Sequence, residues 1–478
     1  MNVKVMKEVL DEATFYLDAD DRTSVYVEYK NYENVPVFEP VGSKVFRAFL
    51  GYRYREETEE LAAPDFRDLL QIAIEDTLFE NKNAVRIGKR LLGNLDSGGI
   101  AYYLANDTAD VVGVTKDGWT VQPRQKIKFL RRSIDLEQVM PVAGGDLLKL
   151  LRPYVNMTQD DFMLFVVFLV HAFCRDSSHF VAIISSDKGS GKSSLSKVVR
   201  ALVDPSKVQT SFLPANENDL KTTLANSYLA CFDNLTKISP QFSDIFCSAV
   251  TGATTVKRQL YTDSDLVTLD LHNLLVLNGI NILPNRSDLL ERSLVFHLKK
   301  IPKDKRRSDS DFWQSFEKDR PYILGAIFDV LTKALSFYDR DLVEKKHRMA
   351  DAHLEMAAIA LALGMTMEDF SRIFWENCEK ASEAYAEQNL VVEWIACFME
   401  GKTKVSDTST KVYEKVYLSA AGDRSLFPKS ASTFTRRLNE EKDALKKAGF
   451  VVNQDKRADA NILEIKRIPI SQRTKTNR

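Results

Sequence analysis

The sequence lacks the cysteine pattern of a zinc site or of a disulfide framework. It has five cysteines and no C-x-x-C pair, and most of the five lie in apolar runs. We therefore expect buried free thiols in a reducing compartment, without cross-links or bound zinc. The cysteines are Cys174, Cys231, Cys247, Cys378 and Cys397.

An excess of one charge and a long apolar run are also missing. The net charge of −1 excludes a polycation, so any nucleic-acid binding has to come from local basic patches. The most apolar stretch, Phe162–Cys174, is shorter than the roughly 20 residues of a membrane-spanning helix, and we expect a buried helix there. The N-terminus carries acids and no uninterrupted apolar segment, unlike a signal peptide. These absences predict a cytoplasmic protein without a membrane partner.

What the sequence does contain is centred on residues 180–195, F-V-A-I-I-S-S-D-K-G-S-G-K-S-S-L. The apolar run predicts a buried strand, and the pattern after the glycines predicts a helix. A strand, a glycine loop, Lys-Ser and a helix form the context of a phosphate-binding loop, in which backbone N–H groups and the helix N-terminus attract phosphate. The nucleotide-binding residues predicted from this pattern are Gly189, Ser190, Gly191, Lys192, Ser193 and Ser194.

This loop predicts ATP and Mg²⁺ as ligands. Lys192 would place a compact cation on the β- and γ-phosphates, and the Ser193 hydroxyl would ligate Mg²⁺. The full pattern G-x-x-x-x-G-K-[ST] begins with glycine where this chain has Ser186, a position that shapes the entry to the turn. A strand-to-helix turn without a ligand is the alternative, but it leaves the Lys-Ser pair unexplained.

Polar residues at the ends of two later apolar strands are candidates for the hydrolytic chemistry. Residues 228–234 predict a strand that ends in Asp233, which would hold Mg²⁺ through its water shell as a Walker B carboxylate. The next residue, Asn234, cannot accept a proton, so the sequence does not identify the base that activates water. Residues 274–279 predict a buried strand with Asn278 near its end, an amide suited to sensing the γ-phosphate.

Arg292 lies just before the last strand predicted in this region, residues 294–298. That position suits an arginine finger, which reaches the γ-phosphate held by a neighbouring subunit. The alternative is a surface ion pair, which would contribute little to stability.

Two basic segments in the middle of the chain are candidates for contact with DNA. Residues 252–271 predict a hairpin that carries Lys257 and Arg258 and that either grips a phosphate backbone or forms a solvated edge. The run KKIPKDKRR, residues 299–307, either contacts DNA or forms the solvated face of a linker.

A third basic candidate lies near the C-terminus. Residues 387–467 predict helices followed by two strands, a layout typical of a winged helix. In that fold Lys429, Arg436 and Arg437 would face DNA. Winged helices also contact proteins, so the sequence leaves both roles open.

The length of 478 residues predicts two to four domains. The first 140 residues mix helical and strand patterns and carry no paired acidic motif of a primase or polymerase, which favours a structural or assembly role. The predicted division is an N-terminal α+β domain at 1–140, a P-loop ATPase domain at 145–310, a helical lid at 311–386, a winged-helix-like domain at 387–467 and a disordered basic tail at 468–478.

The order of motifs GSGKSS, FDNL, VTGATTVKRQLYTDSD, LVLNG and NRSDLLERS resembles a known family. It is similar to the AAA+ helicase domains of the superfamily 3 class, in particular those of phage and mobile-element primase–helicase proteins. The resemblance covers residues 145–300 and extends more loosely to about 465. It implies an α/β fold with an AAA+ P-loop core, a hexameric ring, ATP hydrolysis at subunit interfaces and 3′-to-5′ movement along single-stranded DNA.

By the same resemblance, Lys192, Asp233 and Asn278 would act on ATP in one subunit, and Arg292 would act in trans. No primase half is present, so a separate primase is implied as a partner. The sequence therefore predicts an ATP-driven, ring-forming DNA helicase or translocase of phage or mobile-element replication. Its expected partner is single-stranded DNA, and origin duplex DNA is a further candidate. The alternatives are an ATP-regulated initiator that binds duplex DNA, a defence or regulatory ATPase that needs a protein partner, and, less in keeping with the hairpin and finger motifs, a metabolic kinase.

Overall fold

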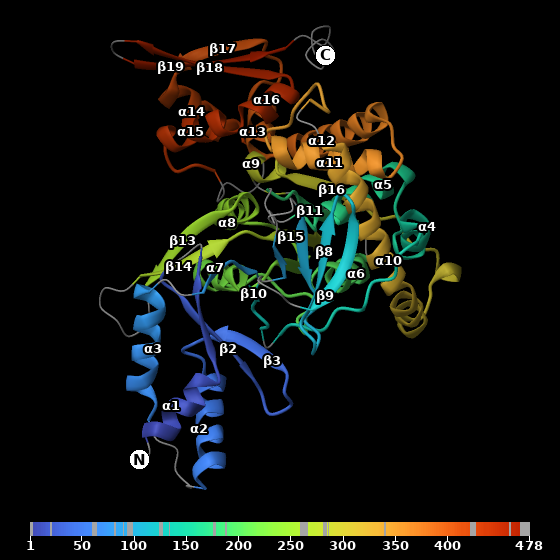
Figure 1. Cartoon of the computed structure of the whole chain (residues 1–478). Coiled ribbons are helices and arrows are strands. Elements are labelled where there is room, and N and C mark those ends of the chain that lie inside the picture. The colour runs from blue at the N-terminus through green and yellow to red at the C-terminus, as the bar shows by residue number, and fades with distance from the viewer. Residues whose placement is uncertain are drawn as a thin grey trace.

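The structure is a computed structural model of the whole chain (Figure 1). It describes all residues except 1–2, 20–21, 60–64, 81–82, 89, 93–98, 124–127, 133, 175–177, 187–188, 259–265, 281–283, 285, 339–340, 421–426, 458–459 and 469–478. The predicted tail lies, from residue 469 on, outside the described residues.

A four-stranded parallel sheet forms the centre of the molecule. Its strands are β11 (Val181–Ser185), β12 (Leu229–Leu235), β15 (Leu274–Gly279) and β16 (Ser293–His297), in the order β12-β15-β11-β16. The strands predicted from the apolar runs are therefore present. The pattern of residues 207–212 also predicts a strand, but the structure has one isolated bridge there, between Ser211 and Phe232, which is parallel.

Alternate residues of this sheet enter two different hydrophobic cores, as the two-residue period of a strand requires. On β11, Ala182 and Ile184 join one core, and Val181 and Ile183 join the other. The first core is filled by helices α5 (Gln159–His171), α6 (Lys192–Val203), α10 (Asp309–Phe337) and α11 (Ala350–Ala362). The second contains α7 (Glu217–Ala225), α8 (Pro240–Thr251) and the C-terminal region.

Helix α5 confirms the buried helix predicted from the most apolar stretch. Phe162 to His171 are nearly all buried, and Phe165 meets the ring of Phe296 edge-on at a centroid distance of 5.5 Å. Each such buried aromatic side chain stabilises the fold by about 1.5–3 kcal/mol, because its apolar surface is removed from water. Among the described residues, no helix is both long and apolar enough to cross a membrane.

The remaining helices of the central part connect or cover this sheet. The elements are α4 (Leu147–Leu151), η1 (Arg152–Tyr154), α9 (Ser287–Leu290), η2 (Lys303–Lys305) and α12 (Met367–Gln388). Helices α10, α11 and α12 occupy the region predicted as a lid, but α10 and α11 share the first core with α5 and α6. They are therefore part of the body that holds the sheet.

The C-terminal region packs against the other face of the sheet and lies at the top of Figure 1. It contains helices followed by a hairpin, as predicted, with one additional strand, β17, that the sequence pattern did not indicate. The three strands pair in the order β17-β19-β18. The elements are α13 (Leu390–Phe398), β17 (Lys404–Thr408), α14 (Ser409–Ser419), α15 (Ala431–Glu440), α16 (Lys442–Lys447), β18 (Phe450–Arg457) and β19 (Ala460–Arg467).

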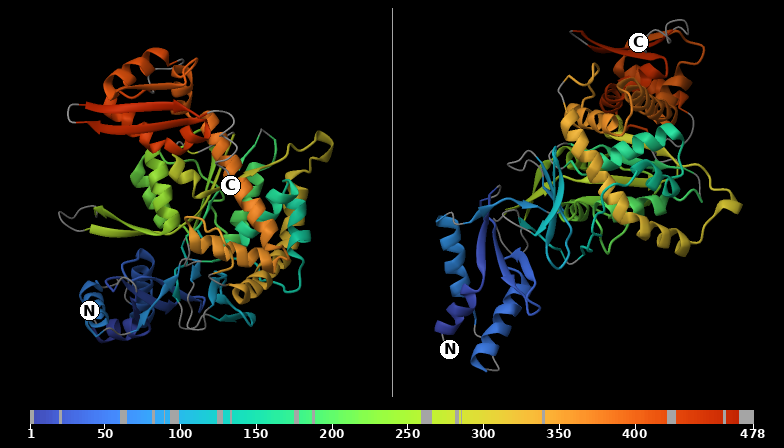
Figure 2. Two further views of the ribbon diagram at one scale, coloured as in Figure 1. Left: turned by 90° about the horizontal axis from the view of Figure 1, so that it is seen from above. Right: turned by 45° about the vertical axis from the view of Figure 1, so that its right-hand side comes forward.

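The first part of the chain lies at the opposite end of the molecule and has a core of its own (Figures 1 and 2). Its sheet has the order β3-β2-β1-β4. The weak pattern of the first 40 residues did not predict the three strands there, whereas the strand at Ala84–Val85 lies where the alternating pattern predicts β structure. The elements are α1 (Val3–Asp11), β1 (Thr14–Asp18), β2 (Val25–Lys30), β3 (Pro36–Pro40), α2 (Lys44–Thr58), α3 (Arg67–Phe79) and β4 (Ala84–Val85).

Residues 87–129 form two small sheets between this end and the centre. Strands β5 and β10 pair in parallel, and the other four form an antiparallel sheet in chain order. These strands are β5 (Ile87–Gly88), β6 (Leu91–Leu92), β7 (Ile100–Tyr103), β8 (Asp110–Thr115), β9 (Gly118–Pro123) and β10 (Lys128–Phe129).

The antiparallel sheet belongs to the core of the central body. Tyr102 and Val112 pack in the same cluster as α5 and α10, and Trp119 donates a 2.8 Å hydrogen bond to Asp329 of α10. The core thus divides near residue 90, and the boundary expected at residue 140 does not coincide with a break in packing. The reason is that the inward faces of β6–β9 are covered by helices far along the chain.

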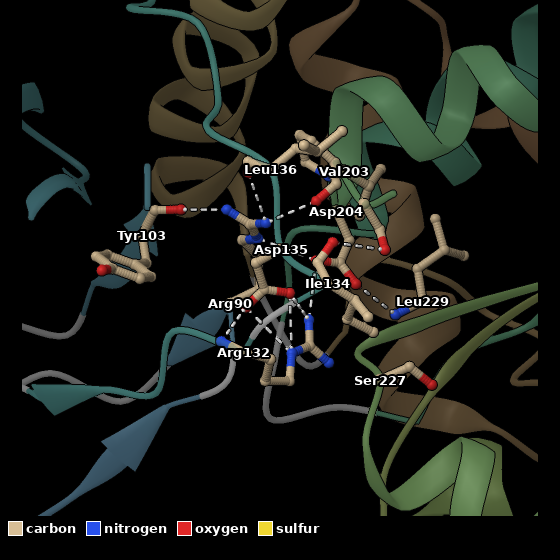
Figure 3. Close-up of polar contacts among 12 residues, drawn as sticks. Arg90, Tyr103, Arg132, Ile134, Asp135, Leu136, Val203, Asp204, Ser227 and Leu229 are labelled. Atoms are coloured by element: carbon tan, nitrogen blue, oxygen red, sulfur yellow. Dashed lines mark hydrogen bonds and ion pairs between the residues drawn. The ribbon is translucent and has the colours of Figure 1, made fainter. Parts of the chain in front are cut away.

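A buried ionic cluster reinforces this connection (Figure 3). Arg90 and Asp204 are both fully buried, and Arg90 Nε lies 3.0 Å from Asp204 Oδ1. Arg132 and Arg200 also approach the Asp204 carboxylate, each at 3.4 Å. Three guanidiniums from separate segments therefore meet one carboxylate at the end of α6.

Candidate nucleotide site

The glycine loop joins β11 to α6 as predicted. Gly189 and Gly191 have φ values of +79° and +89°, in the left-handed region where glycine is favoured. Gly191 is the N-cap of α6 and supplies no side-chain cap. The N-terminus of a helix is the place where backbone N–H groups bind an anionic ligand. Residues 187–188 of the loop lie outside the described residues.

Local contacts explain why Ser186 can replace the first glycine of the pattern. Its hydroxyl lies within hydrogen-bond distance of the Ser190 hydroxyl across the loop, and its carbonyl accepts a 2.6 Å hydrogen bond from Lys192 Nζ. The lysine ammonium therefore lies back over the loop. A serine at position 186 closes the turn through its own side chain, which a glycine pattern does not anticipate.

Asp233 and Asn278 lie at the carboxyl edge of the sheet, beside the loop. The register places Ser185 opposite Gly279 and Ile184 opposite Asn278, and β12 runs parallel to β15. Parallel strands end at the same edge, so residues that follow them meet there. The sequence prediction that these polar residues face one site is thus consistent with the register.

Asn278 links the loop helix to the neighbouring strand through a chain of hydrogen bonds. It is almost fully buried, donates to Ser196 Oγ at 2.8 Å and accepts from the Asn234 N–H at 3.2 Å. Ser196 Oγ in turn donates to the Lys192 carbonyl at 3.2 Å. Asn234 has φ of +58°, a conformation that asparagine tolerates better than most residues. Its backbone, which sequence reasoning did not consider, therefore takes part in the site.

A cavity of about 390 Å³ opens at this edge. Its lining includes the predicted residues Gly189, Lys192, Ser193, Asp233 and Asn278. It also includes residues that were not predicted, Thr210, Ser211 and Phe212, the last of which is 76 % exposed. The sequence indicated these three only as part of a strand at 207–212, which carried no information about the site.

The oxygen atoms that line this cavity are suitable ligands for Mg²⁺. The Ser193 hydroxyl and the Asp233 carboxylate both line it, and both offer the hard oxygen atoms that Mg²⁺ prefers. Lys192, in the same lining, supplies a cation for phosphate. A cation, a hydroxyl and a carboxylate beside a glycine loop form a set suited to a magnesium–nucleotide complex.

The structure does not bring Arg292 to this cavity. Ser293, which follows it, pairs with Val181 at the start of β11, whereas the glycine loop follows the end of that strand. Arg292 therefore lies at the opposite edge of the sheet from the site of its own chain. Its guanidinium is 15 % exposed and forms an ion pair with Asp288.

A second arginine, Arg348, shares this carboxylate. Its Nη1 lies 2.8 Å from Asp288 Oδ1 and close to Glu291. Burial is the largest single influence and would raise the pKa of the Asp288 carboxyl, but the hydrogen bonds from Arg292, Cys247 and Arg348 and the charge of Arg292 together outweigh it and lower the pKa to about 2. Sequence reasoning missed Arg348 because it lies in a segment without a motif, far along the chain.

The candidate DNA-binding residues fall in two separate places. Lys257 and Arg258 lie at the end of β13 (Ala253–Arg258), which pairs with β14 (Leu266–Leu271) in the predicted hairpin. The tip predicted at 262–265 lies outside the described residues. In Figure 2 this hairpin extends outward from the body.

The C-terminal candidates differ in their surroundings. Lys429 and Arg436 are exposed, although Arg436 lies 3.7 Å from Glu440. Arg437 is less exposed, and its guanidinium lies over the ring of Trp394 at 6.0 Å from the centroid. Neighbouring residues of α15 therefore present their charges to different surroundings, which the sequence prediction treated as one surface.

Comparison with known protein families shows to which family the chain belongs. Residues 134–376 match the model of the actinomycete integrative conjugative element replication protein family, a span of just over half of the 478 residues. The chain belongs to this family. It is therefore a replication protein of the mobile-element type, as the motif order suggested. The match contains the glycine loop, the whole central sheet and the first part of α12, up to residue 376.

No curated protein matches this replication protein. Among solved structures, it is similar to the C-terminal region of NrS-1. The A form apo structure of that region gives a TM-score of 0.42 at 11 % identity, covering 97 % of this chain and 98 % of that chain. Two further structures of the region give TM-scores of 0.39 at 11 % identity, covering 97 % and 98 %, and 0.38 at 12 % identity, covering 94 % and 87 %. Scores this low fall short of a shared fold, so the assignment rests on the family model.

Proposed function

We propose that this replication protein is an ATP-driven DNA helicase or translocase with an AAA+ P-loop core that acts as a ring. The observation that carries the proposal is the cavity in which the glycine loop, Lys192, Ser193, Asp233 and Asn278 meet. The order of the parallel sheet, with the loop after a central strand, supports the same assignment.

The residues of the chain divide the work on ATP. The loop N–H groups and Lys192 bind the phosphates, and Asn278 holds the loop helix and the end of β12 in register. When bound, Mg²⁺ held by Ser193 and Asp233 would neutralise phosphate charge. Charge that develops on the γ-phosphate would be stabilised by Arg292 of a neighbouring copy, because Arg292 lies at the edge remote from its own site.

The projecting hairpin supports DNA as the polymer on which this ATPase acts. Lys257 and Arg258 end β13 on an element that extends from the body, where a backbone phosphate is accessible. Single-stranded DNA is the substrate proposed for this hairpin, in a homo-oligomer, with a separate primase as a partner in replication.

A mixing experiment tests the ring and the trans arginine together. Lys192→Ala and Arg292→Ala are assayed alone and as an equal mixture, for ATP turnover with and without single-stranded DNA, while particle mass is recorded. Each variant alone is expected to be inactive. The mixture is expected to regain roughly a quarter of the wild-type rate, because about one interface in four joins an intact Lys192 to an intact Arg292 in a head-to-tail ring.

One control variant sharpens this test. Arg372→Ala removes an exposed arginine that pairs with Asp160 at 2.9 Å, and it is expected to behave like wild type. If the mixture stays inactive although both variants assemble, Arg292 does not act in trans. If wild-type turnover ignores DNA, the helicase assignment is wrong; strong duplex binding would then indicate an initiator, and its absence a partner-dependent ATPase.

A further inference from the structure

The basic run at residues 299–307, which we call the basic strap, lies over the glycine loop. A Cβ atom built on Gly191 would lie 3.6 Å from Ile301 Cδ1, and one built on Gly189 would lie 3.2 Å from Arg306 Nη2 and 3.9 Å from Arg306 Cζ. These are two separate contacts between the strap and the loop. The sequence left the strap as a DNA contact or a solvated linker face, and neither describes this position.

Both ends of the strap are fixed. At its start, Lys299 and Asn156 exchange two hydrogen bonds, Lys299 N to Asn156 O at 2.9 Å and Asn156 Nδ2 to Lys299 O at 2.6 Å. At its end, Arg307 donates to the Asp311 carbonyl at 2.9 Å and to Ser315 Oγ at 2.7 Å. The residues between these anchors have little freedom to leave the loop.

Arg306 differs from its neighbour in having its charge uncommitted. Arg307 is bound to the first turns of α10, whereas no described residue forms an ion pair or hydrogen bond with Arg306. An exposed guanidinium held beside a phosphate-binding loop, without an anionic partner in that part of the chain, has the chemistry of a phosphate ligand.

We infer that Arg306 binds the outer phosphates of the nucleotide held by its own chain. The assignment rests on the proposed nucleotide site and adds a ligand from a segment outside its motifs. Gly189 lines the cavity, and the guanidinium lies against that residue, so a small change of its torsion angles brings its fork of N–H donors to a phosphate oxygen. Because the strap leads directly into α10, the same contact would tie α10 to the nucleotide.

The test measures binding of ATP, ADP and adenosine to the full chain by competition with a fluorescent ATP analogue. The variants are Arg306→Ala, Arg306→Lys and the matched control Lys303→Ala, an exposed cation of the same strap. Arg306→Ala is expected to weaken ATP and ADP about tenfold and to leave adenosine unchanged. Arg306→Lys is expected to restore part of the loss, because it keeps the charge and loses the fork. Lys303→Ala is expected to match wild type.

Lys192→Ala separates this inference from the proposed function. If wild type binds no ATP, or if Lys192→Ala binds it normally, the assignment of the nucleotide site is wrong, and so is the role of Arg306 that rests on it. If Lys192→Ala loses ATP while Arg306→Ala equals Lys303→Ala, only the role of Arg306 is wrong. Equal losses in Arg306→Ala and Lys303→Ala, or a matching loss of adenosine, would also overturn it. An unchanged ATP affinity of Arg306→Ala together with weakened binding of single-stranded DNA would overturn it as well, and would indicate that the strap contacts DNA.

Discussion

Replacing Asp204 with asparagine is expected to destabilise the central body strongly. The carboxylate is fully buried and receives Arg90 at 3.0 Å and Arg132 and Arg200 at 3.4 Å. It also accepts the Leu229 N–H at 3.3 Å. Asparagine preserves the shape, but it removes the single negative charge that faces three guanidiniums and turns one oxygen into a donor.

The size of the effect follows from burial. Removing one partner of a buried ion pair costs about 3–5 kcal/mol, because the other charge stays in a medium that cannot solvate it. Arg132 keeps Asp135 as a partner at 2.6 Å, which limits the loss, whereas Arg90 keeps only backbone carbonyls as partners among the described residues. We therefore expect about 3 kcal/mol, or about 6–12 °C in the midpoint of thermal unfolding.

Thermal unfolding followed by circular dichroism measures this change, with urea unfolding as a second measure. The matched control is Asp160→Asn, which removes a carboxylate that pairs with Arg372 at 2.9 Å but is 49 % exposed. Exposed pairs contribute about 0–1 kcal/mol, so this control is expected to shift the midpoint little. A shift in Asp204→Asn no larger than that of the control would refute the argument that the buried cluster joins residues 90–132 to the central body.

Three further predictions concern the candidate site and the arginine edge. Asn278→Ala and Asn273→Ala each remove a buried amide with two hydrogen bonds, and each should lower the free energy of unfolding by about 1–3 kcal/mol. Only Asn278→Ala should also impair ATP turnover. Equal turnover in the two variants would contradict the role of Asn278 in holding the glycine-loop helix. Gly189→Ala should reduce ATP affinity, because Gly189 has a positive φ and the added methyl group would press on Arg306. The control Gly144→Ala has a similar φ and open space around it, so it should show only a backbone strain of about 1 kcal/mol. Unchanged ATP affinity in Gly189→Ala would contradict the close contact between the glycine loop and Arg306. The lowered pKa of Asp288 should stabilise the folded chain above the ordinary carboxyl range, and this stability should be lost as the pH falls through about 2. Because the side chain is 48 % exposed, Asp288→Asn should cost no more than about 1 kcal/mol at pH 7 and should make stability depend less on pH in acid. An unaltered pH dependence in acid would exclude the Asp288 carboxyl as the source of that dependence.

The sequence predicted the elements that carry a strong period or a motif. The central strands, the buried helix at Phe162–Cys174, the hairpin near Lys257 and the helices before the last two strands all have patterns that depend only on local residues. The same holds for the cluster of Lys192, Asp233 and Asn278, because parallel strands place their ends at one edge.

What the sequence did not predict depends on contacts between distant segments. Arg90 reaches Asp204 across more than a hundred residues, and nothing near Arg90 indicates that it is buried. Arg348 and Arg306 lie in polar stretches typical of loops, so their positions beside Asp288 and Gly189 follow only from the fold. Strands β1 and β3 of the first sheet were missed for another reason, since each is five residues long and alternates too weakly to be distinguished from a loop.

Helix α10 is where these distant contacts converge. Its N-terminal end is joined to the glycine loop by the basic strap, and further along Arg320 donates to Gln138 at 2.7 Å. In its last third, Asp329 accepts from Trp119 of β9 at 2.8 Å. A rigid helix with these three attachments cannot shift at the loop without moving its other partners. The sheet β6–β9, whose inward face belongs to the core of the central body, is thus linked through α10 to the glycine loop, although the two lie far apart in the sequence.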